Sequence, residues 1–482
     1  MMTANFLTRN WPDIVGLGLL LDFVLVAITL IWILHTKRET MSAIAWSLTV
    51  LLLPIFGALF FLIFGVQSIA RPMARKQRRK SAYKLLIATD SQVNADTPSR
   101  WDNLAKLAYQ SGGLPVTDGN RVVLYHDTHP AYEAMLTAIR AAKHHVHVQF
   151  FILRGDNSGK RFFEALTECS SRGVEVRLLY DSVGSYNLPR QCLRPLRQAG
   201  GRVAAFLPIL NPLYRFRMNL RNHRKIVVVD GRIGFTGGLN IGDEYLGLHP
   251  KYGHWRDTFL RVEGPAVHSL QQVFLEDWDF ATTESVHGLE YYPQFKIVPG
   301  QSQVQVVHSG PDLDYKAIRE SYFAAILNAE RRVWIASPYF VPDTGLLNAL
   351  SLKARTGVDI RFLGLFRPDK WLPYLAARFY WTDMLAAGVK VYQYSLGMMH
   401  SKYVLVDGEW ASVGTANLDN RSLLLNFEVN CQLFDPTLVE ELENAFLKDL
   451  TVSVRIDPLT YANRPWVSQL AENAARLFSP IL

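Results

Sequence analysis

The stretch Asn222-His-Arg-Lys-Ile-Val-Val-Val-Asp230 decides the fold of this 482-residue chain, because its pattern occurs twice. Each copy reads His-x-Lys-x4-Asp and continues with a pair of small residues and an Asn that lies 17 positions after the His. One copy of the short motif would arise by chance in roughly a few per cent of chains of this length, but two copies at equal spacing would not. The first copy supplies His223, Lys225, Asp230 and Asn240, and the second supplies His400, Lys402, Asp407 and Asn417.

The residues inside each copy predict a β-hairpin with a polar end. Ile226–Val229 and Tyr403–Val406 are β-branched, aliphatic or aromatic, which is typical of a buried strand. Residues two apart on a strand point to the same face, so the His and Lys of each copy are expected to reach one pocket. A Gly-containing turn follows each Asp, and the next strand then brings the Asn back toward the same end.

A second sign of duplication lies outside the motifs. Leu136–Phe150 and Phe323–Ser337 each resemble a helix that runs into a strand, and they match at an offset of 187 residues. Arg172–Arg177 matches Thr356–Arg361 at an offset of 184. The alternation of helices and strands predicts an α/β sandwich with a largely parallel or mixed sheet in each half. We therefore expect two duplicated domains, related by a pseudo-twofold axis, that share one active site.

Two apolar runs near the start of the chain predict a membrane anchor. Ile14–Leu34 is interrupted only by Asp22, and Met41–Phe64 contains Pro54. Each run is long enough to cross a hydrocarbon core of about 30 Å as a helix. A cleaved signal peptide is the alternative for the first run, but the run has no basic start and no Ala-x-Ala site directly after it, and a second run follows. A two-span transmembrane hairpin is therefore expected.

The formal net charge of +8 is concentrated in one place, because six Lys and Arg residues lie between positions 71 and 80. The rest of the chain is nearly neutral, which argues against a broad nucleic-acid-binding surface. By the positive-inside rule this basic cluster places the catalytic part in the cytoplasm, and the cluster can also contact anionic headgroups. Lys37 and Arg38 between the two runs oppose that topology. A hairpin that enters the bilayer without crossing it stays open as an alternative.

The predicted organisation has four parts: a two-span anchor (residues 1–70), the basic cluster with a linker (71–113), a first catalytic domain (114–300) and a second one with a C-terminal helix (301–482). The first domain carries eleven extra residues before its motif, and these include Tyr214, Arg215, Phe216 and Arg217. This basic and aromatic loop either packs on the surface or contacts lipid, and residues 366–374 offer the same choice. Residues 464–482 place apolar side chains at helical spacing, which predicts a docking face.

The doubled motif resembles that of the phospholipase D superfamily, and nearly the full chain resembles the bacterial cardiolipin synthases of that superfamily. Further shared stretches are Ser42–Trp46, Pro54-x-x-Gly57, Trp255-Arg-Asp, Ser337–Pro342, Asn417-Leu-Asp-x-Arg-Ser and Asn426-Phe-Glu. The resemblance implies transfer of a phosphatidyl group from one phosphatidylglycerol to another, which gives cardiolipin and glycerol. It also implies a multi-pass protein of the bacterial inner membrane. A hydrolytic phospholipase D or another phosphatidyltransferase would use the same residues, and a membrane-tethered nuclease is disfavoured by the charge distribution.

The resemblance also implies roles for the motif residues. One His attacks phosphorus to form a covalent phosphatidyl-histidine while the other protonates the leaving alkoxide, and the first of the two, His223, is the expected nucleophile. Lys225 and Lys402 are expected to clamp the phosphoryl oxygens, with Asn240 and Asn417 donating further hydrogen bonds. The scheme requires no cofactor or metal ion, and no acidic cluster with metal-ligand spacing lies beside the motifs.

Acidic residues complete the expected site. An acid about 25 to 35 positions after each His orients the ring in this family. Glu428 lies 28 positions after His400, and Asp257 lies 34 positions after His223. The motif acids Asp230 and Asp407 complete the two copies of the catalytic motif, but they are expected to anchor the turn and the motif Lys rather than to transfer protons.

Overall fold

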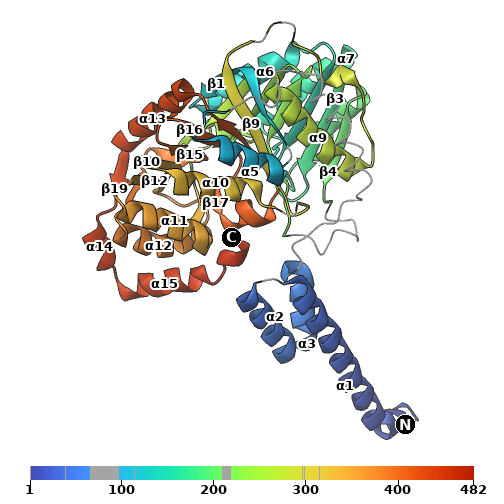
Figure 1. Cartoon of the computed structure of the whole chain (residues 1–482). Coiled ribbons are helices and arrows are strands. Elements are labelled where there is room, and N and C mark those ends of the chain that lie inside the picture. Colours follow the sequence, from blue (N-terminus) through green and yellow to red (C-terminus); the bar gives the residue numbers. More distant parts are fainter. Residues whose placement is uncertain are drawn as a thin grey trace. The chain divides into compact units, whose positions relative to one another are not determined.

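A computed structural model describes residues 2–37, 39–65, 97–112, 114–208, 219–295, 297, 299–313 and 315–482, with side chains from residue 15 onward. The chain divides into two compact units (Figure 1). One holds residues 1–68 and 209–219, and the other holds residues 69–208 and 220–482. The basic cluster at residues 71–80 and the predicted lipid contacts Tyr214, Arg215, Phe216 and Arg217 lie outside the described residues.

The N-terminal unit contains one helix of membrane-spanning length among the described residues. Val15–Thr36, with 22 residues and a mean hydropathy of 2.6, is long and apolar enough to cross a bilayer. The second predicted span is not one continuous helix, because its helix ends just before Pro54, which lacks a backbone N–H and disfavours helical geometry at the preceding residue. The elements of this unit are α1 (Met2–Thr36), α2 (Thr40–Leu52), α3 (Pro54–Phe60) and the π-helical turn η1 (Phe61–Gly65).

The unit of residues 69–208 and 220–482 carries both motifs and is called the catalytic unit below. It is built on one mixed sheet of fifteen strands, in the order β19-β13-β12-β10-β15-β16-β18-β9-β1-β8-β6-β5-β2-β3-β4. The first half supplies β1 (Val116–Tyr125), β2 (His145–Phe150), β3 (Glu175–Asp181), β4 (Arg202–Phe206), β5 (Ile226–Val229), β6 (Ile233–Gly237) and β8 (Phe259–Glu263). The second half supplies β9 (Ser302–Ser309), β10 (Arg332–Ala336), β12 (Asp359–Leu365), β13 (Lys390–Tyr394), β15 (Tyr403–Val406), β16 (Trp410–Gly414), β18 (Glu428–Leu433) and β19 (Ser453–Arg455).

The strand order confirms the predicted duplication. Reading outward from the centre, β1-β8-β6-β5-β2-β3-β4 in one half corresponds to β9-β18-β16-β15-β10-β12-β13 in the other. In each half the three outer strands of this series are parallel, and the motif strand joins them antiparallel. The halves meet where β1 pairs antiparallel with β9. This pairing joins the two predicted sheets into one, and the two halves lie side by side in Figure 1.

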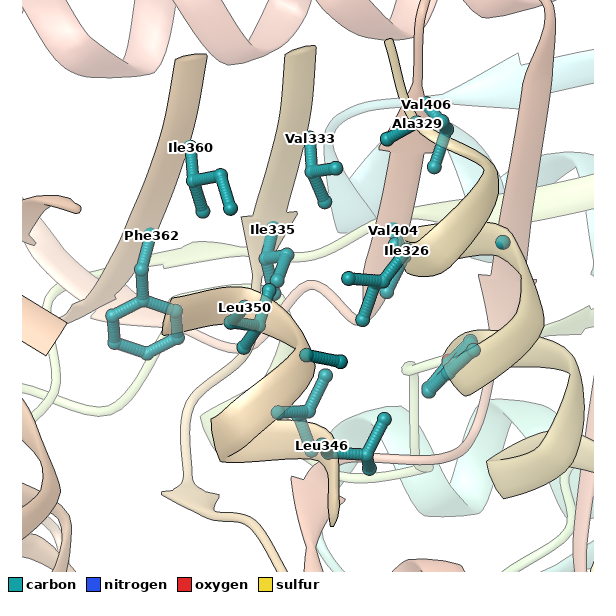
Figure 2. Packing of buried hydrophobic residues seen from close by; sticks show 14 of the residues in the cluster. Ile326, Ala329, Val333, Ile335, Leu346, Leu350, Ile360, Phe362, Val404 and Val406 are labelled. Carbon is teal, nitrogen blue, oxygen red and sulfur yellow. The ribbon is translucent and has the colours of Figure 1, made fainter. Parts of the chain in front are cut away.

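Helices cover both faces of the sheet. In the second half, Val333 and Ile335 of β10 point toward α10 and α11, where Leu350 packs against them (Figure 2). The intervening Trp334 points to the other face and stacks on Phe446 of α13, with ring centroids 5.3 Å apart. The helices are α5 (Asp102–Gly112), α6 (Thr128–Arg140), α7 (Asn157–Ser171), α8 (Arg194–Gln198), α9 (Ala266–Thr282), α10 (Ala317–Asn328), α11 (Thr344–Arg355), α12 (Trp371–Ala386), α13 (Pro436–Thr451), α14 (Pro458–Ala462) and α15 (Trp466–Arg476).

Two parts of the catalytic unit differ from the sequence prediction. The end of the predicted linker is helix α5, which buries Leu104 and Ala108 in the core of the second half. Helix α15 was expected to dock through its apolar face, but that face points outward. The exposed fractions of Trp466, Leu470 and Leu477 are 72%, 59% and 73%. The docked side instead carries Glu472, which forms ion pairs with Arg378 and Arg464, and these pairs decide the orientation of the helix.

Candidate active site

Both motifs form the predicted hairpins. In the first, β5 pairs antiparallel with β6 so that Ile226 lies opposite Thr236. In the second, β15 pairs with β16 so that Tyr403 lies opposite Val413. The motif His and Lys of each copy immediately precede the first strand of the hairpin, and all four side chains are buried. A fully apolar strand therefore carries its two polar residues at one end, where they can share a site.

The backbone of each motif His is hydrogen-bonded to the opposite half of the catalytic unit. The His223 amide donates to the carbonyl of Phe427 over 2.9 Å, and the His400 amide donates to the carbonyl of Arg256 over 2.7 Å. The second contact continues a short parallel pair between β7 (His254–Arg256) and β14 (Gly397–Met399). Because the backbone of each His is bonded to the opposite half, the site forms only at the junction of the two halves.

The predicted carboxylates contact the imidazoles, but with the partners exchanged. The Nδ1 atom of His223 lies 3.0 Å from both carboxylate oxygens of Glu428. The Nδ1 atom of His400 lies 2.6 Å from Oδ2 of Asp257. The expectation that each acid orients the His before it in the sequence is therefore wrong. Asp257 lies just before β8, and Glu428 is the first residue of β18. These two strands flank the central pair β9 and β1, and each side chain reaches the ring of the other half.

Small residues after the motif strands make room for these carboxylates. A Cβ atom at Gly238 would overlap the carboxylate of Asp257, so only glycine fits at this position. The second half has Thr415 at the equivalent position, and its hydroxyl donates to Glu428 over 2.6 Å while it accepts from the Val429 amide. The small-residue pairs of the two motifs thus have different tasks, since one admits a carboxylate and the other binds one.

The motif lysines are buried together with their histidines. Nζ of Lys225 donates to the His223 carbonyl over 2.7 Å, and Nζ of Lys402 donates to the His400 carbonyl. Burial lowers the pKa of Lys225 to about 7 and that of Lys402 to about 8, against the opposing charges of Glu428 and Asp257. Each ammonium keeps further N–H groups that can donate to an anion, so the pair forms a site for a phosphoryl group.

The two motif asparagines are buried beside these groups. Oδ1 of Asn240 accepts a hydrogen bond from the Ile152 amide over 3.1 Å, which leaves the NH2 group as the end that can donate. Oδ1 of Asn417 is buried, and it has no hydrogen-bond partner within the described part of the chain. This oxygen is an acceptor, so a group that pairs with it must donate, as a substrate hydroxyl can and a phosphoryl oxygen cannot.

The motif acids lie at the opposite ends of the motif strands from the histidines. Both adopt left-handed backbone conformations, with φ of 53° at Asp230 and 57° at Asp407. The Asp230 carboxylate accepts hydrogen bonds from the amides of Lys143, His144 and His145, at the start of β2. The Asp407 carboxylate accepts from the amides of residues 330–332. They anchor the turn as expected, and the described residues show no hydrogen bond between either acid and a motif Lys.

Several supporting residues were missed by the sequence analysis. Arg224, inside the first motif, forms an ion pair with the buried Asp277 of α9 at 2.7 Å, and it also donates to the carbonyls of Glu428 and Ser309. In the other half, Arg256 pairs with Asp449 of α13 at 2.8 Å. Both arginines sit beside a catalytic residue in sequence. The sequence shows where the two arginines lie relative to the motifs. No sequence pattern identifies Asp277 and Asp449 as their partners.

Aromatic rings line both histidines. The ring of Phe151 lies 4.9 Å from that of His223, and the ring of Trp255 lies 5.2 Å from that of His400, measured between centroids. The Nζ atom of Lys225 also lies 5.6 Å from the Phe151 ring centroid. Apolar walls of this kind keep water away from the reacting groups and strengthen the electrostatic interactions between them.

The two His–carboxylate pairs differ electrostatically. Burial and the charges of Lys225 and Lys402 hold the pKa of His223 well below its usual range. Burial lowers the pKa of His400 less, to about 4, against the charge of Asp257. Burial opposes ionisation of Asp257, but His400 and Lys402 outweigh it and keep the pKa of the carboxyl low. Burial raises the pKa of Glu428 to about 7. The His400 pair therefore retains a proton on the imidazole more readily than the His223 pair does.

Comparison with known proteins agrees with this geometry. The family described as "Cardiolipin synthase, PLD-like domain" matches residues 135–278 and 322–450, and the family "Phospholipase_D-nuclease N-terminal" matches residues 24–65. The chain is 40% identical to a cardiolipin synthase of Geobacillus thermodenitrificans, over 92% of this chain and 90% of the relative. It is 38% identical to the major cardiolipin synthase ClsA of Bacillus subtilis, over 96% and 98% of the two chains.

A solved structure shares the fold. The phosphatidylserine synthase of Haemophilus influenzae superimposes with a TM-score of 0.61 at 15% identity, covering 79% of this chain and all of that one. The full-length similarity to curated enzymes, together with two family segments that each contain one motif hairpin, establishes the relationship. The chain belongs to the cardiolipin synthase family of phospholipase D-like phosphatidyltransferases.

Proposed function

We propose that the protein transfers a phosphatidyl group from one phosphatidylglycerol to the terminal hydroxyl of another, which gives cardiolipin and releases glycerol. The observation that carries the proposal is the pair of buried imidazoles, each held by a carboxylate of the opposite half, beside two buried lysines. A covalent relay needs a nucleophile and a separate acid, and the two imidazoles supply both. The same relay would serve a hydrolytic phospholipase D, so the two histidines support phosphatidyl transfer but do not identify the acceptor. The names of the relatives support the same reaction.

In the first half-reaction, Nε2 of His223 attacks phosphorus and a P–N bond forms. The P–O bond to the headgroup glycerol breaks, and His400 gives its Nε2 proton to the departing oxygen. In the second half-reaction, neutral His400 takes the proton from the terminal hydroxyl of the second phosphatidylglycerol. The resulting alkoxide attacks phosphorus, the P–N bond breaks, and His223 returns to its neutral state. One P–O bond is broken and one is formed, so no energy source is needed.

The assignment of His223 as the nucleophile rests on the difference between the two pairs. A nucleophilic imidazole must be neutral, and the low pKa of His223 favours that form. A general acid must carry a proton, and the pKa of His400 is lowered to about 4 by burial. The ionised Asp257 at 2.6 Å and the negative charge of a bound phosphodiester both favour the protonated form of His400. Glu428, whose pKa is raised to about 7, supports a positive charge on His223 less strongly. The difference between the two His–carboxylate pairs therefore favours His223 as the nucleophile and His400 as the acid.

The phosphoryl oxygens are held by Lys225 and Lys402, with the amide groups of Asn240 and Asn417 as additional donors. Both lysines are buried, and the charge of Lys402 contributes to lowering the pKa of Lys225. A phosphodiester anion would relieve this repulsion, and it would stabilise the ammonium forms in return. Binding and charge neutralisation are thus coupled in the site.

The reaction is tested with the purified full-length protein in phosphatidylglycerol vesicles. The expected products are cardiolipin and free glycerol in equal amounts. Phosphatidic acid as the main product would instead assign a hydrolytic phospholipase D. Phosphatidylethanolamine added as an alternative donor, with ethanolamine release as the readout, distinguishes a phosphatidyltransferase of different headgroup preference.

The proposal also includes a location in the bacterial cytoplasmic (inner) membrane, with the catalytic unit on the cytoplasmic side because of the basic cluster at residues 71–80. Its apolar helix at Val15–Thr36 and the match to the cardiolipin synthase family support this location. Residues 366–374, for which lipid contact was one expectation, begin where β12 ends and expose Trp371 at the start of α12. Lys370 beside it lowers the pKa of His223, so this loop lies near the site. Helix α15 packs on α12, and its outward apolar face extends the same lipid-contacting surface.

A further inference from the structure

The second apolar run, Thr40–Gly65, folds back on itself. We infer that it is a re-entrant hairpin, which enters and leaves the membrane on one side and occupies a single leaflet. The protein would then cross the bilayer once, through α1, and the acyl chains of the leaflet on the catalytic side would surround the hairpin. The inference rests on the proposed membrane location but not on the reaction.

The side-chain contacts of Phe61 show that the chain returns to its starting level. In a continuous helix, Phe61 would lie about 22 Å beyond Trp46, because each of the fifteen intervening steps adds about 1.5 Å. The ring centroids of the two residues are instead 5.5 Å apart. Phe61 also packs at 5.6 Å from Trp32, which lies close to the end of α1. The end of the second run thus lies at the same level as its beginning.

Each arm of the hairpin is too short to cross a membrane. Helix α2 has 13 residues, which corresponds to a length of about 20 Å, whereas the hydrocarbon core measures about 30 Å. The arms pack closely, because a Cβ atom at Gly57 would lie only 2.6 Å from the Thr49 carbonyl oxygen. Glycine at this position therefore lets the second arm return directly along the first.

The turn between the arms keeps its backbone groups bonded, which lipid surroundings require. The Leu53 amide donates to the Thr49 carbonyl over 2.9 Å, and the Gly57 amide donates to the Leu53 carbonyl over 2.5 Å. The inner faces bury Val50 and Phe61 completely. The side chains around the turn point outward, and the exposed fractions of Leu52 and Phe56 are 77% and 62%. An apolar tip with a satisfied backbone suits contact with acyl chains.

The re-entrant path also removes the conflict in the charge pattern. If the second run crossed the membrane, Lys37 and Arg38 would lie on the side opposite the six basic residues at positions 71–80. In the re-entrant path all eight lie on one side. The positive-inside rule then places that side in the cytoplasm and the N-terminus outside, with eight basic residues on the cytoplasmic side against Arg9 on the other.

Cysteine labelling of the full-length protein separates the two paths. In a background with Cys169, Cys192 and Cys431 replaced by Ser and with conversion of phosphatidylglycerol retained, whatever its product, single cysteines are introduced as Thr3→Cys, Thr36→Cys and Ser68→Cys. A membrane-impermeant maleimide is applied to intact spheroplasts and to inside-out vesicles. The re-entrant path predicts that Thr3→Cys is labelled from outside only, whereas Thr36→Cys and Ser68→Cys are both labelled only in inside-out vesicles.

The other patterns contradict the inference. A crossing second run would place Thr3→Cys and Ser68→Cys on one side and Thr36→Cys on the other. Labelling of all three from one side would mean that α1 does not cross. Because each result is read from labelling alone, the inference can fail while the enzyme makes cardiolipin, and it can hold even if the product is phosphatidic acid.

Discussion

Nδ1 of His223 lies 3.0 Å from the carboxylate of Glu428, which is 205 residues away in the opposite half of the catalytic unit. Asp257 of the first half contacts His400 of the second in the same way. Each half thus supplies one imidazole to the site and orients the imidazole of the other. Neither half can be catalytically complete alone, even though both carry a full motif.

The crossed pairs make a prediction about two carboxylate variants. Glu428→Gln should slow the attack of His223, and Asp257→Asn should slow proton donation by His400, each by roughly 10²- to 10⁴-fold in kcat with little change in KM. A donor lipid with a p-nitrophenol headgroup needs no protonation of its leaving group. Its burst of p-nitrophenol should therefore be restored in Asp257→Asn and remain slow in Glu428→Gln.

Glu440→Gln, which changes an exposed carboxylate on α13, is the matched control and should keep normal kinetics with both donors. Rescue of Glu428→Gln in place of Asp257→Asn would show that each acid serves the His of its own half.

The buried lysines predict a pH dependence of anion binding. Their pKa values lie below the usual value of 10.5, at about 7 for Lys225 and about 8 for Lys402, so each positive charge is lost as the pH rises through that value. Sulfate keeps its charge over this range. Its affinity, measured by calorimetry on the full-length protein in detergent, should fall about tenfold or more between pH 6 and pH 9.

Lys225→Met should weaken sulfate binding at pH 6, and it should remove the fall in sulfate affinity near pH 7 that the titration of Lys225 causes. Lys143→Met, which changes an exposed lysine, should leave the profile as it is. An affinity that stays constant up to pH 9 in the unmodified protein would mean that these lysines remain charged or do not contact the anion.

The ion pair of Arg224 and Asp277 predicts a large loss of stability when one partner is removed. Both side chains are buried, and Arg224 links α9 to the carbonyls of Glu428 and Ser309. Arg224→Met removes the cation that pairs with the buried Asp277 carboxylate, which keeps its hydrogen bonds from Gln149 and Asn222. The variant should cost about 3 to 5 kcal/mol, measured as a lower thermal midpoint. Arg161→Met removes an exposed pair with Glu133 and should cost no more than about 1 kcal/mol. Equal decreases of the thermal midpoint in Arg224→Met and Arg161→Met would contradict a structural role for the buried pair.

The outward face of α15 predicts a separation of lipid binding from stability. Trp466 and Leu470 are exposed, so replacing both with Ser should leave the thermal midpoint unchanged. The double variant should show a raised KM with vesicles but not with a short-chain phosphatidylglycerol that is soluble as monomers. Equal loss of activity with both substrates would argue against a role of this face in lipid contact. Glu472→Ala, which removes two ion pairs from the docked side, should lower the thermal midpoint instead.

The sequence predicts those parts of the site that depend on local pattern. The strand at Ile226–Val229 and its hairpin follow from side-chain periodicity, and the duplicated spacing identifies His223 and His400 as partners. The pairing of carboxylates was not predictable in this way. Asp257 is close to His223 in sequence, but the contacts between β7 and β14 bring it to His400. Nonlocal strand pairing, and not sequence distance, decides which acid meets which ring.

Two other differences have equally specific causes. Helical periodicity identifies the apolar face of α15 but does not say whether that face points inward, and two ion pairs of the buried Glu472 decide this. The run Met41–Phe64 has the length and hydropathy of a span, but Pro54 ends the helix in its middle. A composition window averages over that single residue, whereas the backbone geometry depends on it.

Trapping of the phosphatidyl-enzyme tests the central claim most directly. The unmodified protein, His400→Ala and His223→Ala are mixed with a phosphatidyl donor that carries p-nitrophenol as its headgroup, quenched, and analysed by mass spectrometry of the labelled peptides. The account predicts a phosphatidyl group on His223 in His400→Ala, and no adduct in His223→Ala. An adduct on His400, or equal labelling of the two variants, would contradict the assignment of His223 as the nucleophile and His400 as the acid.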